Sequence, residues 1–241
     1  MLFPVFNFDS NFQKLGLNYI VFAVVHEMDQ KHLLSDTYLS QLHKVEQSAL
    51  DIETSELESL PVLQGYVELV RQIGRSPKKF PPSAWALIDI IKRHGKFPHI
   101  LPIVDIYNII TLTYNLSLGV HDLSKLKGEA INFRISPGGE FFYPIGGGEK
   151  RTKTGDYVYS DSDTLLAWLD ARDSERVKVM SQTRDIIIVI QGNVNTSLEY
   201  RVRALEELCH LLVKTCGGMA MLGKAEVTSS KTNWWSLNNT D

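Results

Sequence analysis

The chain has 241 residues, of which 44% are hydrophobic and 22% are charged, and its formal net charge is −3 at pH 7. This composition is typical of a globular protein that buries a core, and it excludes a disordered or low-complexity chain. The longest apolar runs, residues 19–25 and 186–190, are strand length, well short of the roughly 18 residues that a membrane-spanning helix needs. We therefore expect a soluble protein without a membrane partner. Met1 to Pro4 show no basic stretch or small-residue cleavage site, so we expect a cytoplasmic location.

The first hundred residues predict one strand followed by helices. Residues 17–25 are β-branched and aromatic, which indicates a buried strand, and the leucines of residues 36–52 are spaced for one helix face. Pro61 suits the first turn of another helix, whose apolar stripe ends at Gly74. Residues 74–82 hold three prolines and so predict an irregular, basic loop. Ser83 then predicts the cap of a helix that ends at Gly95.

The remainder of the chain predicts a long helix, a β-rich region and a last helix. Residues 101–116 are apolar except for Asp105, Asn108 and Thr111, which lie three residues apart and could line a pocket from one helix stripe. After residue 128 the pattern changes to alternation and turns. The last expected elements are a central strand at residues 185–191, an amphipathic helix at 198–216 and a strand at 219–227.

These elements predict a single domain over residues 1–223. Its helix-rich half spans about residues 1–100 and its β-rich half about residues 101–223. Residues 224–241 are expected to form a C-terminal tail, because the sequence from residue 228 onward is polar apart from Trp234 and Trp235 and has no periodicity. Cys209 and Cys216 fall on one face of the last predicted helix, where two thiols are expected to be buried apolar residues instead of a disulfide or metal pair.

Charge is unevenly distributed along the chain. Residues 1–70 hold 3 lysines against 10 acidic residues, whereas residues 71–184 hold 17 Lys and Arg against 12 Asp and Glu. A polyanion would be steered to the middle of the chain and away from its first third. A solvated basic face is the alternative explanation of such an excess.

Two polar clusters and a glycine run could carry chemistry. His121 beside Asp122 could orient a water or contact a carbonyl, or the two could form a surface turn in which Asp122 caps the next segment. Residues 172–178 alternate in charge and could clamp phosphates while a carboxylate polarises a water, or could be a solvated loop. Gly146 to Gly148 could admit an anion or a ribose to the backbone, or could simply be a turn between strands. No phosphate loop, nucleophile elbow or Cys-x-x-Cys motif is present.

Several motifs in order resemble one known domain. Residues 101–110 are similar to an apolar-Val-Asp-x-x-Asn segment, and residues 119–128 to a Gly-x-x-Asp-Leu-x-x-Leu-x-Gly segment, of the B3/B4 domain of the phenylalanyl-tRNA synthetase beta chain. Further matching pieces are Phe133-Arg134, Gly139-Glu140-Phe141, residues 144–149 and 158–161, Arg172-Asp173-Ser174 and Lys178-Val179. The resemblance covers roughly residues 10 to 220 and is strongest to stand-alone bacterial relatives of this domain.

The resemblance implies an α+β fold in which β-sheet layers are flanked by helices, with a pocket between its two halves. It implies hydrolysis of mischarged aminoacyl-tRNA in trans, with the aminoacylated 3′ end of tRNA as partner and no DNA partner. It implies no cofactor, no metal and no covalent nucleophile, so that a positioned water attacks the ester. The synthetase's other modules are absent, and aminoacylation is therefore not expected.

The resemblance also assigns roles to residues, all expected to converge on a single cavity. The family pattern has a histidine at the position of Gly119, and the family glutamate best matches Glu175. The residues that would position water or the substrate amine are His121, Asp122 and Glu175. The residues that would bind the aminoacyl-adenosine end are Asn108, Gly119, Arg134, Gly147, Arg172, Ser174 and Lys178. The alternative is a non-catalytic module that binds tRNA, a nucleoside or an amino acid.

Overall fold

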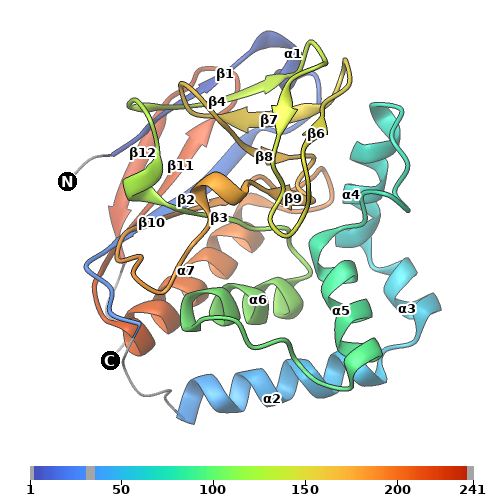
Figure 1. The fold of residues 1–241 in the computed structure, drawn as a ribbon, viewed down its shortest axis with the longest axis vertical. Helices are drawn as coiled ribbons and strands as arrows, with labels where there is room; N and C mark the ends of the chain where they lie inside the picture. The colour runs from blue at the N-terminus through green and yellow to red at the C-terminus, as the bar shows by residue number, and fades with distance from the viewer. Residues whose placement is uncertain (1–2, 31–35, 238–241) are drawn as a thin grey trace.

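Two five-stranded sheets and a set of helices make up the part of the chain that the structure, a computed structural model, describes: residues 3–30 and 36–237 (Figure 1). The elements in chain order are β1 (Val5–Phe8), α1 (Ser10–Gln13), β2 (Tyr19–His26), α2 (Asp36–Asp51), α3 (Thr54–Ser59), α4 (Pro61–Gln72), α5 (Ser83–His94), α6 (Pro102–Tyr114), β3 (Gly119–Asp122), the 3-10 turn η1 (Leu123–Lys125), β4 (Ala130–Ile135), β5 (Phe141–Phe142), β6 (Lys150–Arg151), β7 (Tyr157–Ser160), β8 (Leu165–Trp168), β9 (Arg172–Asp173), the 3-10 turn η2 (Glu175–Val177), β10 (Ile186–Ile190), α7 (Leu198–Cys216), β11 (Met219–Glu226) and β12 (Thr232–Ser236).

The two sheets differ in how they are paired. Sheet A has the strand order β1-β4-β7-β8-β9, with β1 and β4 parallel and the remaining pairs antiparallel. Sheet B has the order β12-β11-β2-β10-β3 and is antiparallel throughout. The hairpin of β5 and β6 lies beside sheet A as a separate two-stranded unit.

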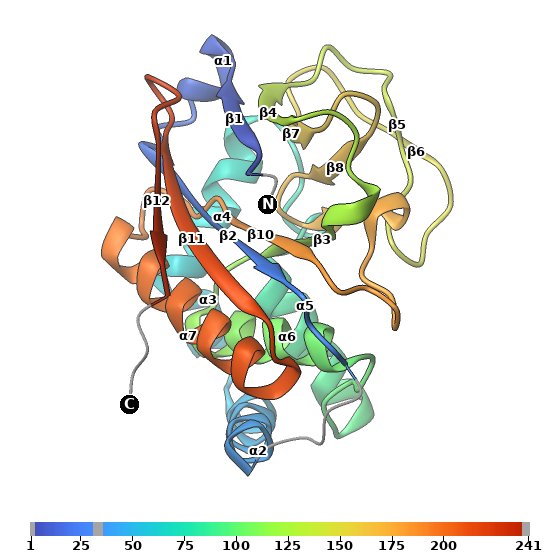
Figure 2. The ribbon, with the colours of Figure 1, turned by 90° about the vertical axis from the view of Figure 1, so that its left-hand side faces the viewer.

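Sheet B is the middle layer of the fold. In β2, Val21, Ala23 and Val25 belong to a core shared with the helices, whereas the alternate residues Ile20, Phe22 and Val24 belong to a core shared with sheet A. Side chains alternate between the faces of a strand, so each face of sheet B fills a different core. Figure 2 shows β11, β2 and β10 passing between α6 and α7 on one side and β4, β7 and β8 on the other. This is the α+β fold of helix-flanked sheet layers that the sequence predicts.

Most predicted elements are confirmed to within a few residues. The strands β2 and β10 and the helices α2, α4, α5, α6 and α7 all occupy their expected segments, and Gly95 ends α5 in the left-handed conformation. Ser83 is not the cap of α5, because Pro82 holds that position and the Ser83 hydroxyl donates to the carbonyl of Asp170 at 3.1 Å. Cys209 and Cys216 are free thiols buried against the helical core, as expected.

The segment expected as a C-terminal tail contains a strand. β12 pairs with β11 from Ala225↔Thr232 to Met221↔Ser236 and forms the edge of sheet B, while residues 238–241 lie outside the described residues. The polar sequence of this segment fits an edge strand, because Trp234 and Trp235 are half-buried and their neighbours are more exposed. The helix-rich and β-rich halves also interleave, since β2 from the first half lies between β10 and β11 from the second.

A buried ion pair joins the basic loop of residues 74–82 to sheet A. The Arg75 guanidinium donates to both carboxylate oxygens of Asp156, at 2.6 and 2.5 Å, and Trp168 Nε1 donates to the same carboxylate at 2.8 Å. Asp156 is only 1% exposed, and the guanidinium also lies over the rings of Phe80 and Trp168. The loop is therefore held against β7 and β8 immediately before α5 begins.

We expect Asp156→Ala to lower the free energy of unfolding by about 3–5 kcal/mol, because it leaves the Arg75 charge buried without its partner. Urea denaturation measures the change. Asp51→Ala removes an exposed carboxylate at the end of α2 and is the control, with an expected change within about 0.5 kcal/mol. Equal effects of the two substitutions would contradict a structural role for the ion pair.

Candidate functional site

A cavity of about 230 Å³ lies where α6, the start of α5, the start of β3 and the β8–β9 connection meet. Its polar lining comes from all four of these elements, which are distant in sequence. The residues that line it are Ser83, Tyr107, Asn108, Thr111, Ser117, Leu118, Gly119, Ile145, Tyr159, Ala167, Asp170, Ala171, Arg172 and Asp173. Of the predicted site residues, it gathers Asn108, Gly119 and Arg172. Asn108 and Thr111 do line a pocket from one stripe of α6, as their spacing indicates.

Asp105, the third polar residue of that stripe, has a structural role. Its carboxylate accepts from the Ile100 N–H at 2.8 Å, from the Tyr38 hydroxyl at 3.0 Å and lies 3.1 Å from His99 Nδ1. Asp105 sits in the first turn of α6 and reaches back to the N–H of Ile100, the residue before the cap Leu101. It fixes where α6 begins and so where Asn108 lies.

The β8–β9 connection is a tight turn with an unusual backbone. Leu169 and Asp170 have φ of 57° and 49°, and Ala171 N–H donates to the Trp168 carbonyl at 3.2 Å. Trp168 pairs with Arg172, so the connection has three residues, and positive φ at two of them normally calls for Asn or Gly because other side chains are disfavoured there. Backbone strain of this kind persists where the surrounding structure over-determines it, and it gathers at functional sites. Here it buries Leu169 in the core and turns Asp170 to the cavity.

Two carboxyl groups at the cavity are perturbed. Burial raises the pKa of Asp173 to about 7, and the weak contact from the Val120 N–H at 3.5 Å offsets little of that shift. Burial and the nearby Asp173 raise the pKa of Asp170 well above its usual range. Two carboxyl groups that share a poorly solvated site do not ionise together, so their pKa values separate. At neutral pH, Asp170 is therefore the protonated member and Asp173 titrates.

Gly119 makes room for a tyrosine. A Cβ atom at position 119 would lie 1.9 Å from the Tyr159 hydroxyl, so only glycine allows Tyr159 to reach this wall of the cavity. The same hydroxyl lies 2.7 Å from His121 Nε2. His121 is fully buried between the sheets, which lowers its pKa to about 3 and keeps the imidazole neutral. His121 therefore faces the core and approaches the cavity only through Tyr159.

The remaining predicted residues are held in local structure. Asp122 caps η1 by accepting from Ser124 N–H at 3.0 Å and also accepts from the Thr183 hydroxyl at 2.6 Å, as the alternative supposed, but it and His121 are buried on β3 and not in a surface turn. Glu175 forms an ion pair with Lys178, which lowers the Glu175 pKa, and neither residue lines the cavity. Gly147 lies in an exposed turn, with its N–H donating to the Pro144 carbonyl at 3.0 Å.

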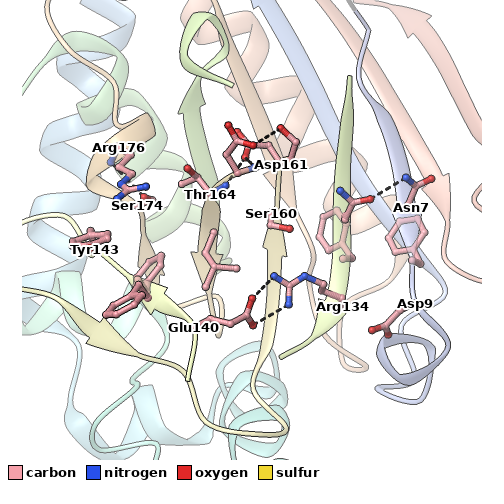
Figure 3. Close-up of a pocket in the computed structure, with 18 residues that line it drawn as sticks. Asn7, Asp9, Arg134, Glu140, Tyr143, Ser160, Asp161, Thr164, Ser174 and Arg176 are labelled. Carbon is pink, nitrogen blue, oxygen red and sulfur yellow. Dashed lines mark hydrogen bonds and ion pairs between the residues drawn. The ribbon is translucent and has the colours of Figure 1, made fainter. Parts of the chain in front are cut away.

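A second, larger cavity of about 940 Å³ lies on the other face of sheet A and holds Arg134 and Ser174 (Figure 3). Arg134 donates to both carboxylate oxygens of Glu140, at 2.9 and 2.6 Å. Ser174 is buried and caps η2, accepting from Arg176 N–H at 3.3 Å. The expectation that all predicted residues converge on one cavity is therefore wrong: they divide between two cavities, the core and the surface.

Comparison with known protein families identifies the family of the chain. The B3/4 domain family matches residues 65–217. The chain belongs to the B3/4 domain family. The predicted resemblance to the B3/B4 domain of the phenylalanyl-tRNA synthetase beta chain is thereby confirmed. A comparison with curated proteins finds no match.

Every residue that lines the smaller cavity falls inside the B3/4 match, whereas Asn7, Phe8 and Asp9 of the larger cavity precede it. Sequence reasoning missed Tyr159, Asp170 and Asp173 as cavity residues. The Leu169-Asp170 turn lacks the glycine or Asn-Gly pair that marks turns with positive φ, and Asp173 stood inside a charge cluster that also suits a solvated loop. Within residues 3–30 and 36–237, no helix is long and apolar enough to cross a bilayer, and no His, Cys, Asp or Glu cluster suits a metal ion.

The raised pKa of Asp173 predicts a pH-dependent stability. Asp173 has a pKa near 7 when folded and near 3.8 when unfolded, so the folded state binds its proton more tightly and loses stability as pH rises between these values. Asp173→Asn removes that loss. We expect its Tm to exceed that of the wild type by a few degrees more at pH 8 than at pH 4, since about 1 kcal/mol moves Tm by about 2–4 °C in a domain of this size. A Tm difference that is the same at both pH values would contradict the assignment.

Proposed function

We propose that this B3/4 domain hydrolyses the ester of mischarged aminoacyl-tRNA in trans, with the smaller cavity holding the amino acid. The observation that carries the proposal is the position of the Asp173 carboxyl at the wall of that cavity, where burial raises its pKa to about 7. A group that titrates near the working pH is suited to general acid–base catalysis. The relation of the family to the phenylalanyl-tRNA synthetase beta chain supports tRNA as the partner.

The size of the cavity supports an amino acid as its occupant. Pockets for drug-sized ligands measure about 300–1,000 Å³, so a volume of about 230 Å³ suits one amino-acid side chain and its ester carbon, not a nucleotide. The lining combines apolar surface from Leu118 and Ala167 with the Asn108 amide and the Thr111 hydroxyl. Such a mixture binds an apolar or aromatic side chain while a few polar groups fix its orientation.

The two carboxyl groups divide the proton transfers. Ionised Asp173 takes a proton from the attacking water as its oxygen bonds to the ester carbon. Collapse of the tetrahedral intermediate breaks the bond between that carbon and the ribose oxygen, and protonated Asp170 supplies the proton that this oxygen gains. The products are the free amino acid and tRNA with its terminal hydroxyl restored. Asp173 takes the role that the resemblance had assigned to Glu175, whose carboxylate is paired with Lys178 away from the cavity.

His121 acts as a positioning residue for the Tyr159 hydroxyl. The imidazole is neutral, and among the described residues its Nδ1 has no hydrogen-bond partner. A buried N–H without an acceptor is rarer than a bare acceptor, so the proton belongs on Nε2, which then donates to the Tyr159 oxygen. The Tyr159 O–H is thus left to donate to the oxyanion that develops on the ester carbonyl. Arg172, exposed at the cavity rim, contributes a cation for the adjacent phosphate.

The proposal predicts which substitutions stop the release of amino acid. With a panel of mischarged tRNAs, we expect Asp173→Asn to lower kcat by on the order of 100- to 10,000-fold. Tyr159→Phe should lower kcat by on the order of 100-fold with little change in KM, because it removes one oxyanion donor but keeps the ring. Glu175→Gln is the control and should leave kcat near the wild-type value.

The opposite pattern, in which Glu175→Gln abolishes release and Asp173→Asn does not, would sink the assignment of Asp173. Failure of the wild type to release amino acid from any member of the panel would favour the alternative, a non-catalytic module for tRNA, a nucleoside or an amino acid. The acidic first 70 residues favour that alternative, since they disfavour broad contact with tRNA.

The pH profile tests the same carboxyl independently. Asp173 must be ionised to accept a proton, so the single-turnover rate should rise with pH and level off above about 7, the pKa of the group. Asp173→Glu should retain a rise of this kind, and Asp173→Asn should flatten it. A wild-type rate that does not change between pH 5 and pH 8 is the result that the proposal does not allow.

A further inference from the structure

The larger cavity has no part in the proposed hydrolysis, yet it is the larger and more open of the two. Its floor is the outer face of sheet A, where Asn132 and Ser160 are register partners and Arg134 follows on the same face. Figure 3 shows Arg134, Glu140 and Ser160 between Asn7 and Asp9 on one side and Tyr143, Ser174 and Arg176 on the other. A volume of about 940 Å³ falls at the upper end of the range of about 300–1,000 Å³ for ligand pockets and can hold one or more nucleotides.

Two arginine–aromatic pairs stand at this cavity. The Arg176 guanidinium lies 4.6 Å from the centre of the Tyr143 ring, and the Arg151 guanidinium lies 3.9 Å from the centre of the Phe141 ring. Phe141 is 48% exposed, and both arginines are exposed. Exposed aromatic rings beside arginines are the platforms on which unpaired nucleobases stack, with the cations placed for the phosphates.

Three of the four acidic groups that line the cavity are engaged within the protein, whereas the fourth, Asp163, is exposed and accepts from the Ser162 hydroxyl at 3.0 Å. Asp9 accepts from the N–H groups of Phe12 and Ile135, at 2.5 and 3.1 Å, and Asp161 accepts from those of Lys127 and Thr164, at 2.8 and 2.7 Å. Glu140 is paired with Arg134. Carboxylates held by backbone N–H groups repel an anion less than solvated ones do, so the two exposed cations Arg151 and Arg176 face one exposed carboxylate, that of Asp163.

The two cavities lie on either side of one ridge. Tyr143 and Ser174 line the larger cavity, while Ile145 and Asp173, one or two residues away, line the smaller one. Ile145 N–H donates to the Asp173 carbonyl at 3.0 Å, and Glu175 N–H donates to the Tyr143 carbonyl at 2.7 Å, so these segments form one rigid wall. A polymer strand bound in the larger cavity therefore needs to cross only this ridge for its end to reach Asp173.

We propose that the larger cavity binds unpaired nucleotides at the 3′ end of an RNA, with Phe141 and Tyr143 as stacking platforms. This inference rests on the proposed function for the identity of the RNA, because the strand then presents its terminal aminoacyl group to the smaller cavity. It assigns base stacking to residues on the β5–β6 hairpin and phosphate contact to Arg151 and Arg176. Asn7, whose amide donates to Asn132 at 3.0 Å, extends the site to β1, outside the B3/4 match.

Binding of a fluorescein-labelled, unpaired RNA of about twelve nucleotides, measured by fluorescence anisotropy with the full chain, tests the proposal. The double variant Phe141→Ala/Tyr143→Ala should raise the Kd on the order of tenfold or more, since it removes stacking on two rings. Tyr143→Phe keeps the ring and loses only the hydroxyl, so it should bind as the wild type does. Val194→Ala removes an equally exposed apolar side chain that lines neither cavity and should also leave the Kd unchanged.

Two results would overturn the stacking site. One is wild-type affinity in the double variant with an unchanged Tm, and the other is equally tight binding of the same RNA annealed to its complement, which hides the base faces. If the double variant is unstable, the single variant Phe141→Ala replaces it, because Phe141 is exposed. We expect Phe141→Ala to show part of the loss of RNA affinity.

The experiments distinguish a failure of the stacking site from a failure of the proposed hydrolysis. Asp173→Asn should bind the RNA with wild-type affinity while losing amino-acid release. RNA binding that depends on Phe141 and Tyr143, without release from any mischarged tRNA, would leave the stacking site standing and end the proposed hydrolysis. Release of amino acid by the double variant with an unchanged KM would end the stacking site and leave the proposed hydrolysis standing.

Discussion

The burial of sheet B on both faces is the constraint on which the rest of the structure depends. β2 and β10 fill the helical core with one set of alternate residues and the core against sheet A with the other. A slip of one residue would exchange the two sets, so the register is strongly specified. Because β3 pairs with β10 in that register, His121 stands opposite Ile187, on the face toward sheet A, while Val120 stands opposite Ile188, on the face toward the helices. The meeting of His121 with Tyr159 thus results from the packing of the middle layer.

Several features at the smaller cavity lower the stability of the folded state. The cavity retains two consecutive non-glycine residues at positive φ, two carboxyl groups whose pKa values are raised by burial, and a neutral histidine whose pKa is lowered by burial. The strained backbone and the two carboxyl groups destabilise the folded state at neutral pH, whereas the histidine does so only below its ordinary pKa of 6.5. Proteins tolerate such features where function requires them, and other interactions must offset them. The buried pair of Arg75 and Asp156 supplies part of that offset, since it holds the segment leading into Ser83, whose hydroxyl bonds the carbonyl of Asp170.

The elements that could be predicted from the sequence are those whose pattern reports burial directly. Residues 17–25 and 185–191 are continuous apolar runs, and residues 198–216 repeat with a helical period, so tertiary contacts only reinforce the local signal. The roles of polar residues could not be predicted, because a carboxylate that caps a turn and one that lines a cavity look alike in sequence. Asp105 binds the segment before α6 and Asp122 caps η1, whereas Asp173 lies at the cavity, and only the tertiary structure distinguishes them. β12 was missed for a related reason: an edge strand covers little apolar surface and carries little periodicity.

The absence of a side chain at Gly119 and the position of the Tyr159 hydroxyl depend on one another. The family pattern that the chain resembles has a histidine where Gly119 stands, and a side chain there would begin 1.9 Å from the Tyr159 hydroxyl. A side chain at position 119 therefore requires the Tyr159 hydroxyl to leave its observed position. The space that the family histidine would fill holds instead a hydroxyl backed by the imidazole of His121, two residues further along β3. In this chain the His121 imidazole lies in the core, where burial keeps it neutral, and the Tyr159 phenol lies at the cavity wall. A neutral donor that does not titrate below pH 10 leaves Asp173 as the group that sets the pH dependence of the cavity.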